Sequence, residues 1–97
     1  MNSQICDAIR KKHLLEFYYD GHFRKVEPHT FGVSKRGNDL LAAYQVSGGS
    51  KVGKVPDWKQ FNLDKIETLK VLDETFSSPR SGYVKGDSRM SEIYCEL

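Results

Sequence analysis

The sequence predicts a small, mostly-β fold: a five-stranded barrel with an N-terminal helix and a short C-terminal helix. The length of 97 residues corresponds to one domain. Short apolar and aromatic runs recur along the chain, and Gly, Asn, Asp or Pro residues separate them. The composition, with 38% hydrophobic and 29% charged residues, excludes a disordered chain, and no apolar run approaches the length of a membrane span.

Local patterns predict the individual elements. Apolar residues recur at helical spacing over residues 5–9, and the basic residues that follow suit the negative end of a helix dipole. The pair Asp20-Gly21 is typical of a tight turn between strands, and the Gly-rich segment 47–57 predicts a loop. Pro28 is expected to bend or end the second strand, because proline cannot donate to a ladder. The expected strands cover residues 14–19, 22–27 with a continuation over 30–34, 40–46, 58–62 and 67–72.

We divide the chain into a barrel domain, residues 1–76, and a C-terminal extension, residues 77–97. Four apolar residues of the extension fall at i, i+3, i+4 and i+7, which predicts an amphipathic helix over residues 88–96. So short a helix is marginal alone, so it must pack on its own barrel or on a second chain. We favour a homodimer, since the strand edges of a small barrel need covering. The four residues are Met90, Ile93, Tyr94 and Leu97.

The two cysteines, Cys6 and Cys95, stand near opposite ends of the chain. They form no CxxC pair and no Cys/His ligand spacing, so we expect no zinc site. The first residues lack the charged-then-apolar order of a signal peptide. Two free thiols in a reducing cytoplasm are therefore the expectation, and a disulfide would require that the two ends meet.

Charge is distributed unevenly along the chain. Residues 21–65 contain eight Lys and Arg against four Asp and Glu, whereas residues 72–97 contain three against five. A basic middle favours an anionic partner, although a solvated surface explains the same charges without any partner.

A series of short motifs gives the chain a resemblance to a known family. The motifs are Ala8-Ile9 in the helix, Leu15-x-Phe17-x-Tyr19, Arg24-x-Val26-x-Pro28-His29, Leu41-x-Ala43-Tyr44, and Lys59-x-Phe61-x-Leu63-Asp64-Lys65-Ile66. Their order over residues 5–76 resembles the WYL domain of bacteria, an Sm/SH3-like small barrel. The resemblance implies a module that senses a ligand or binds nucleic acid, since family members bind single-stranded nucleic acid or nucleotides through a basic groove.

The chain departs from this family in several places. The tripeptide that names the family falls at residues 39–41, which read Asp-Leu-Leu, and the loop over residues 47–57 is longer than expected. Lys59 and Lys65 stand where the family usually has arginine, so the charge is kept but the bidentate fork is absent. No helix-turn-helix module precedes the barrel within these 97 residues.

A protein that binds a single strand needs cations for the phosphates and flat rings on which bases stack. The candidate binding residues are Arg24, Lys25, His29, Tyr18, Tyr44, Lys59 and Lys65. Each has a structural alternative. Arg24 could pair with Glu16 or Glu27 across strands, His29 could bond a loop carbonyl, and Tyr44 could belong to the core. Among the neighbouring aromatics, Phe61 is expected in the core and Trp58 at the barrel end.

We expect no enzyme, no metal and no cofactor. The sequence contains no GxSxG, HExxH or Walker-type motif, and its three histidines show no metal-ligand spacing. The leading hypothesis is a module that binds single-stranded nucleic acid or a nucleotide-like anion in regulation or phage defence. The alternative is a protein-interaction module that forms a homodimer or docks to a regulatory or CRISPR-associated partner.

Overall fold

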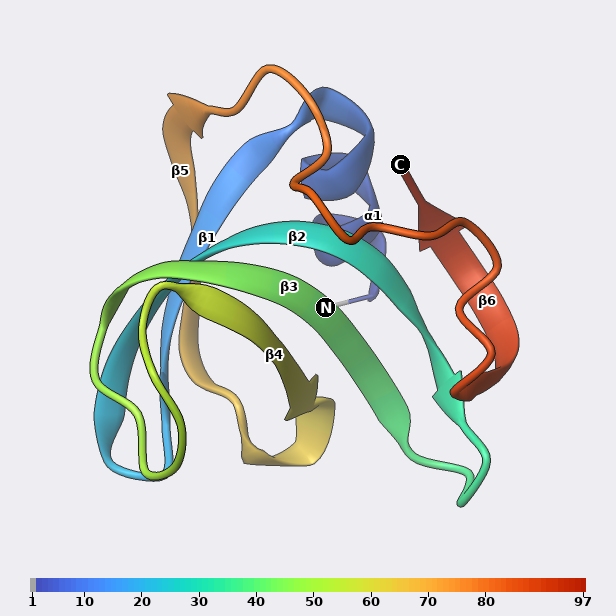
Figure 1. Ribbon diagram of the computed structural model, residues 1–97, viewed down its shortest axis with the longest axis horizontal. Coiled ribbons are helices and arrows are strands. Elements are labelled where there is room, and N and C mark those ends of the chain that lie inside the picture. The colour runs from blue at the N-terminus through green and yellow to red at the C-terminus, as the bar shows by residue number, and fades with distance from the viewer. Residues whose placement is uncertain (1) are drawn as a thin grey trace.

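The computed structural model describes residues 2–97, which form one α-helix, one 3₁₀ helix and six strands in one sheet (Figure 1). The strands pair antiparallel in the order β4-β3-β2-β1-β5, and β6 pairs with β2. A mostly-β fold with an N-terminal helix is thereby confirmed, but the sheet is not closed into a five-stranded barrel. The elements are α1 (Asn2–Lys11), β1 (His13–Tyr19), β2 (His22–Ser34), β3 (Asp39–Gly48), β4 (Asp57–Asn62), the 3₁₀ helix η1 (Leu63–Lys65), β5 (Glu67–Thr75) and β6 (Met90–Glu96).

The hairpin of β1 and β2 closes at the expected turn. Asp20 and Gly21 have φ angles of +52° and +75°, the left-handed values of a type I′ turn. This turn matches the natural twist of paired strands, and it sets Tyr19 opposite His22 and Phe17 opposite Arg24. Every second residue of β1 therefore faces the core.

Strand β2 is long enough to have different partners along its two halves. Its first half pairs with β1 and its second half with β6, while β3 runs along the other side. The sequence led us to expect that the strand bends or ends at Pro28; it does not end there and continues to Ser34. The register with β3 shifts between Pro28 and Thr30, and such a bulge accommodates a residue that has no N–H to donate.

The core lies between α1 and the inner face of the sheet. Ile5, Ala8 and Ile9 of the helix are buried in the same cluster as residues of β1, β2, β3 and β4. Phe17 and Phe61 meet edge to face with ring centroids 4.9 Å apart. Phe61 is 1% exposed, which confirms its expected place in the core.

The predicted C-terminal helix is wrong, because Met90–Glu96 forms strand β6. It adds to the second half of β2, with Thr30 opposite Glu96 and Ser34 opposite Met90. The helical spacing of four apolar residues competed here with an open strand edge, whose backbone groups gain hydrogen bonds from a paired strand. Gly32 permits the close approach, since a Cβ atom there would lie 2.2 Å from the carbonyl oxygen of Glu92.

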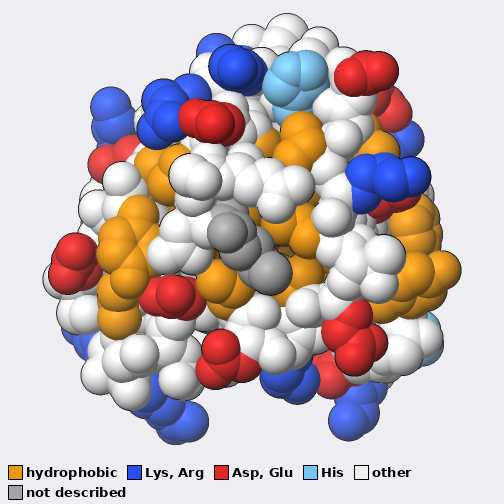
Figure 2. All heavy atoms as spheres, turned by 180° about the vertical axis from the view of Figure 1, so that it is seen from behind, with side chains coloured by type: hydrophobic (Ala, Val, Ile, Leu, Met, Phe, Trp, Pro, Cys, Tyr) orange, Lys and Arg blue, Asp and Glu red, His pale blue; other side chains and the backbone are white. Residues whose placement is uncertain are grey.

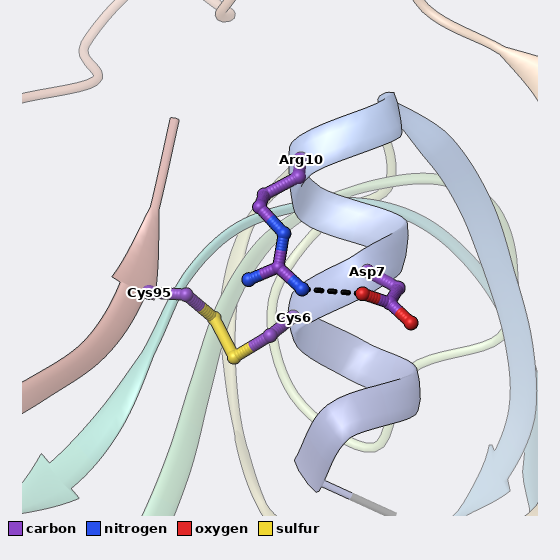
Figure 3. Close-up of a disulfide and its surroundings, with 4 residues drawn as sticks. All are labelled: Cys6, Asp7, Arg10 and Cys95. Carbon is purple, nitrogen blue, oxygen red and sulfur yellow. Dashed lines mark hydrogen bonds and ion pairs between the residues drawn. A yellow bond between two sulfur atoms is a disulfide. The ribbon is translucent and has the colours of Figure 1, made fainter.

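The expectation of two free thiols is also wrong. Strand β6 ends beside α1, and Cys6 and Cys95 form a disulfide with their Cα atoms 5.7 Å apart (Figure 3). The same view shows Asp7, the residue after Cys6, paired with Arg10 one turn further along α1. The two ends of the chain therefore do meet, which a separation of 89 residues cannot reveal in the sequence.

The surface behind the sheet carries both signs of charge. Figure 2 shows Lys and Arg side chains interspersed with Asp and Glu around separate apolar patches on this face. The basic middle of the sequence thus does not produce one basic face on this side. Over residues 2–97, no helix is long and apolar enough to cross a membrane.

Candidate functional site

The seven candidate binding residues lie in three separate places. Arg24, Lys59 and Lys65 gather where the β1–β2 turn meets the loop between β3 and β4, and these two segments lie side by side (Figure 1). Tyr18 and Lys25 occupy the outer face of the β1–β2 hairpin, while His29 and Tyr44 lie elsewhere, beneath the segment that links β5 to β6.

The first group surrounds a cavity of about 260 Å³, which we call the cationic pocket. Arg24 and Lys59 line it together with Lys51, a cation that the sequence patterns did not single out. Lys65 adjoins it through an ion pair of 2.9 Å with Asp20. The remaining lining residues are Tyr19, Asp20, Ser50, Val52, Gln60 and Phe61. Only the fold brings the Gly-rich loop that carries Lys51 against the hairpin turn.

Arg24 forms the buried part of this pocket. It is 3% exposed, and its Nη2 and Nη1 atoms donate to the Tyr19 carbonyl at 3.0 Å and to Gln45 Oε1 at 3.1 Å. Its guanidinium carbon lies 5.4 Å from the Tyr19 ring centre and 5.6 Å from that of Phe61. Burial lowers the pKa of Arg24, yet a guanidinium keeps its proton in proteins. Its hydrogen bonds go to neutral oxygens, so the positive charge persists in the pocket.

The proposed cross-strand ion pairs of Arg24 do not form. Glu16 faces Lys70 at 3.8 Å, and Glu27 pairs with Arg80. Neither carboxylate therefore neutralises Arg24.

Two lysines hold the rim of the cationic pocket. Lys59 Nζ donates to Ser50 Oγ at 3.1 Å and to the Val52 carbonyl at 2.9 Å, which fixes the loop over the pocket. Lys65 lies 4.9 Å from the centre of the Tyr19 ring, and its hydrogen bond to Asp20 lowers the pKa of that carboxyl and raises the pKa of the ammonium. The cations Arg24, Lys51, Lys59 and Lys65 thus face a single carboxylate, that of Asp20.

Tyr18 and Lys25 point away from this pocket. Each is a strand neighbour of a pocket residue, and successive side chains of a strand lie on opposite faces of the sheet. Tyr18 is 48% exposed and meets Phe23 edge to face at 5.9 Å. Lys25 is paired with Glu74 at 2.6 Å.

His29 is fully buried and has no exposed surface for a ligand. Its Nε2 atom lies 3.1 Å from the backbone nitrogen of Arg80 and must accept that N–H, so its Nδ1 atom carries the proton and donates to the Glu27 carbonyl at 2.8 Å. Burial lowers the pKa of His29 and keeps the ring neutral. The expected alternative is a bond to a loop carbonyl; the histidine does bond a backbone carbonyl, but that carbonyl belongs to strand β2.

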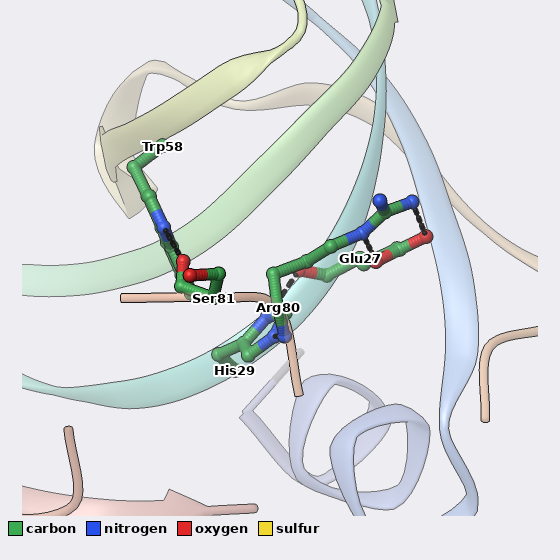
Figure 4. Close-up of polar contacts among 5 residues, drawn as sticks. All are labelled: Glu27, His29, Trp58, Arg80 and Ser81. Atoms are coloured by element: carbon green, nitrogen blue, oxygen red, sulfur yellow. Dashed lines mark hydrogen bonds and ion pairs between the residues drawn. The ribbon is translucent and has the colours of Figure 1, made fainter. Parts of the chain in front are cut away.

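Tyr44 is covered by the segment of residues 77–83, which we call the strap. The Arg80 guanidinium carbon lies 4.7 Å from the centre of the Tyr44 ring. The same guanidinium donates to both carboxylate oxygens of Glu27, at 2.7 and 2.9 Å, and the Trp58 indole donates to the Ser81 carbonyl at 2.9 Å (Figure 4). Arg80 therefore already covers the face of the Tyr44 ring that we considered for base stacking.

A larger cavity, of about 470 Å³, lies beside the strap. Trp58, Tyr83 and Arg89 are among its lining residues. Its arginine is already neutralised, since Arg89 donates to both carboxylate oxygens of Asp87, at 2.9 and 2.6 Å. This cavity therefore provides less positive charge for an anion than the cationic pocket does.

Comparison of the chain with protein-family models, with curated proteins and with solved structures finds no match. The functional argument therefore rests on the geometry of the sites themselves.

Proposed function

We propose that this chain is a WYL-like module with an Sm/SH3-like sheet that binds single-stranded nucleic acid or a nucleotide-like anion and has no catalytic role of its own. The observation that carries the proposal is the excess of cations over carboxylates in the cationic pocket. A regulatory or defence role is what the resemblance to WYL domains adds.

The hydrogen bonds within the pocket favour phosphate as the recognised group. Ammonium groups attract an anion as point charges, whereas the one guanidinium is already committed to the Tyr19 carbonyl and Gln45. Ser50 adds a hydroxyl at the rim. Such groups track a sugar-phosphate backbone and do not read bases, so we expect little dependence on nucleotide sequence.

Lys51 provides the most direct test, because it lies in a loop and its replacement leaves the sheet intact. For Lys51→Ala, and more strongly for the double variant Lys51→Ala/Lys59→Ala, we expect weaker binding of a fluorescein-labelled oligothymidylate by anisotropy. Removal of one charge-assisted hydrogen bond corresponds to about a tenfold decrease in affinity. The slope of log affinity against log salt should fall by about 0.7 for each phosphate that the variant no longer neutralises.

Lys35→Ala is the matched control, since Lys35 is an exposed lysine outside the lining of the cationic pocket. It should change neither the affinity nor the salt slope by a comparable amount. ATP serves as a second probe, for the nucleotide-like anion. The proposal is contradicted if the lysine variants bind both the oligonucleotide and ATP as tightly as the unmodified chain does, or if the unmodified chain binds neither. A strong preference for one nucleotide sequence would contradict phosphate tracking alone.

The alternative function, protein interaction or homodimerisation, draws on a different surface. Tyr18 and Phe23 form an exposed aromatic pair, and β4 and β5 end the sheet. Light scattering of the unmodified chain and of Tyr18→Ser tests it. A dimer that the substitution dissociates supports this function, and a monomer at every concentration opposes it.

A further inference from the structure

The strap is held more firmly than its composition suggests. Residues 77–82 read Ser-Ser-Pro-Arg-Ser-Gly and are all exposed as residues. Nevertheless the Arg80 side chain, the Arg80 N–H and the Ser81 carbonyl each have a hydrogen-bonding partner on the sheet. A short exposed segment with this composition is ordinarily mobile, so the order here comes from the surface that receives it.

That surface has the donors and acceptors that one arginine and its neighbour require. Glu27 on β2, only 7% exposed in its side chain, presents both oxygens to the guanidinium. Tyr44 on β3 offers its ring face to the same group. His29 accepts the backbone N–H, and Trp58 on β4 donates to the next carbonyl. All four groups stand on strands of one sheet, so the backbone that carries them is held by strand pairing and not by the strap.

We propose that Glu27, His29, Tyr44 and Trp58 form a receptor for an arginine-containing peptide of a partner protein, and that the strap fills this receptor in cis. Opening of the strap then exposes the receptor to a peptide in trans. The chain's own segment shows the form that such a peptide takes.

The receptor selects both the side chain and the residues after it. A bidentate pair with a carboxylate needs the planar fork of arginine, which lysine lacks. Gly82 has a φ of +95°, and a Cβ atom there would lie 3.0 Å from Trp58 Nε1. The fitting sequence is therefore arginine, one further residue that contributes its carbonyl, and then glycine.

The strap competes with any such peptide because it is attached on both sides. The Phe76 N–H donates to the Lys12 carbonyl at 3.0 Å, and the Tyr83 hydroxyl donates to the Leu97 carbonyl at 2.8 Å. A tethered segment acts at an effective concentration on the order of millimolar, so the unmodified chain should bind a free peptide weakly.

Arg80→Ala removes the guanidinium from Glu27 and Tyr44 and leaves only the strap's two backbone hydrogen bonds, to His29 and Trp58, for a peptide to displace. The single tryptophan, Trp58, serves as a fluorescent reporter. The probe is the acetylated and amidated peptide Ser-Pro-Arg-Ser-Gly-Ser, which copies residues 78–82. Its last residue is serine in place of tyrosine, so that the peptide does not fluoresce. We expect saturable binding to Arg80→Ala, at least about tenfold weaker binding to the unmodified chain, and at least about tenfold weaker binding of the peptide with citrulline in place of arginine. The double variant Arg80→Ala/Glu27→Gln should show no preference for arginine over citrulline.

Equal binding of the arginine and citrulline peptides, or no saturable change in Arg80→Ala, overturns the proposal. If circular dichroism shows that Arg80→Ala is unfolded, Arg80→Lys is titrated instead, since it keeps the charge without the fork. The arginine peptide should then displace the strap and quicken hydrogen exchange at the residue 80 amide, and unchanged exchange overturns the proposal. None of these outcomes depends on whether the cationic pocket binds nucleic acid.

Discussion

Two arginines of this chain lie against aromatic rings, and their surroundings differ in the feature that decides what each can do. Arg24, in the cationic pocket, is 3% exposed and bonds to neutral oxygens. Arg80, on the strap, keeps a side chain that is 45% exposed and is neutralised by the Glu27 carboxylate. The buried arginine thus bonds to no carboxylate, whereas the exposed one does.

This difference separates a site that can bind an external anion from an internal ion pair, that of Glu27 and Arg80, which holds the strap on the sheet. Lys51, Lys59 and Lys65 surround Arg24 and add to its charge, with Asp20 as the one opposing carboxylate. At the strap, one guanidinium meets one carboxylate and an aromatic ring, so no charge remains for a phosphate. Cations interleaved with aromatic residues occur in both regions, and the carboxylates beside them distinguish the two.

The largest expected effect comes from removing the disulfide, which joins β6, the element that follows the strap, to α1. The double variant Cys6→Ser/Cys95→Ser should lose about 4 kcal/mol of unfolding free energy in urea, because the crosslink closes a loop of nearly the whole chain. Hydrogen exchange should quicken over residues 77–96 and change least around Arg24. Equal acceleration in both regions would show that the strap and the cationic pocket are not mechanically separate.

Glu27→Gln should remove the ion pair that holds Arg80 of the strap and leave the cationic pocket intact. Loss of one partner of a buried ion pair costs about 3–5 kcal/mol, and the exposure of Arg80 reduces the expected loss to about 2 kcal/mol. Urea unfolding measures this change, and anisotropy with an oligonucleotide should give an unaltered affinity. A weaker oligonucleotide affinity would mean that the strap contributes to anion binding.

Acidification should weaken the strap side through His29. Its pKa in the folded chain is lowered by burial, so below the unfolded value of about 6.5 the unfolded chain binds the extra proton first. Stability should therefore be complete above about pH 7.5 and fall by about 1 kcal/mol between about pH 7.5 and about pH 5.5. Urea unfolding at both pH values, with His29→Gln as the control, measures this. A variant with the same pH dependence as the unmodified chain would assign the effect to another group.

Asp20→Asn should give the smallest change and should sharpen the description of the cationic pocket. Asparagine followed by glycine suits a type I′ turn as well as the native pair does, so the hairpin is retained. Removal of the one carboxylate frees Lys65, so we expect the oligonucleotide to bind a few-fold more tightly to this variant, with a larger gain at low salt than at high salt. Anisotropy at two salt concentrations measures the gain. Weaker binding by Asp20→Asn would show that Asp20 orients Lys65 productively.

Local patterns determined much of the fold. The Asp20-Gly21 turn, the helix near residues 5–9 and the strand runs appear in the structure, because turn preference and apolar periodicity act between neighbouring residues. The motif resemblance and the interleaving of cations with aromatic residues indicated Arg24, Lys59 and Lys65, and these three do gather.

Only the tertiary structure decided the rest. The tail became β6 because the edge of β2 was available to pair with it, and this pairing brought Cys95 to Cys6. Glu27 and Arg80 are 53 residues apart, so nothing local in the sequence joins them, yet the paired Arg80 covers Tyr44 with its guanidinium and donates its backbone N–H to His29. Residue type sets what a side chain can bind, but the partners that long-range folding places beside it determine whether that capacity stays free for a ligand.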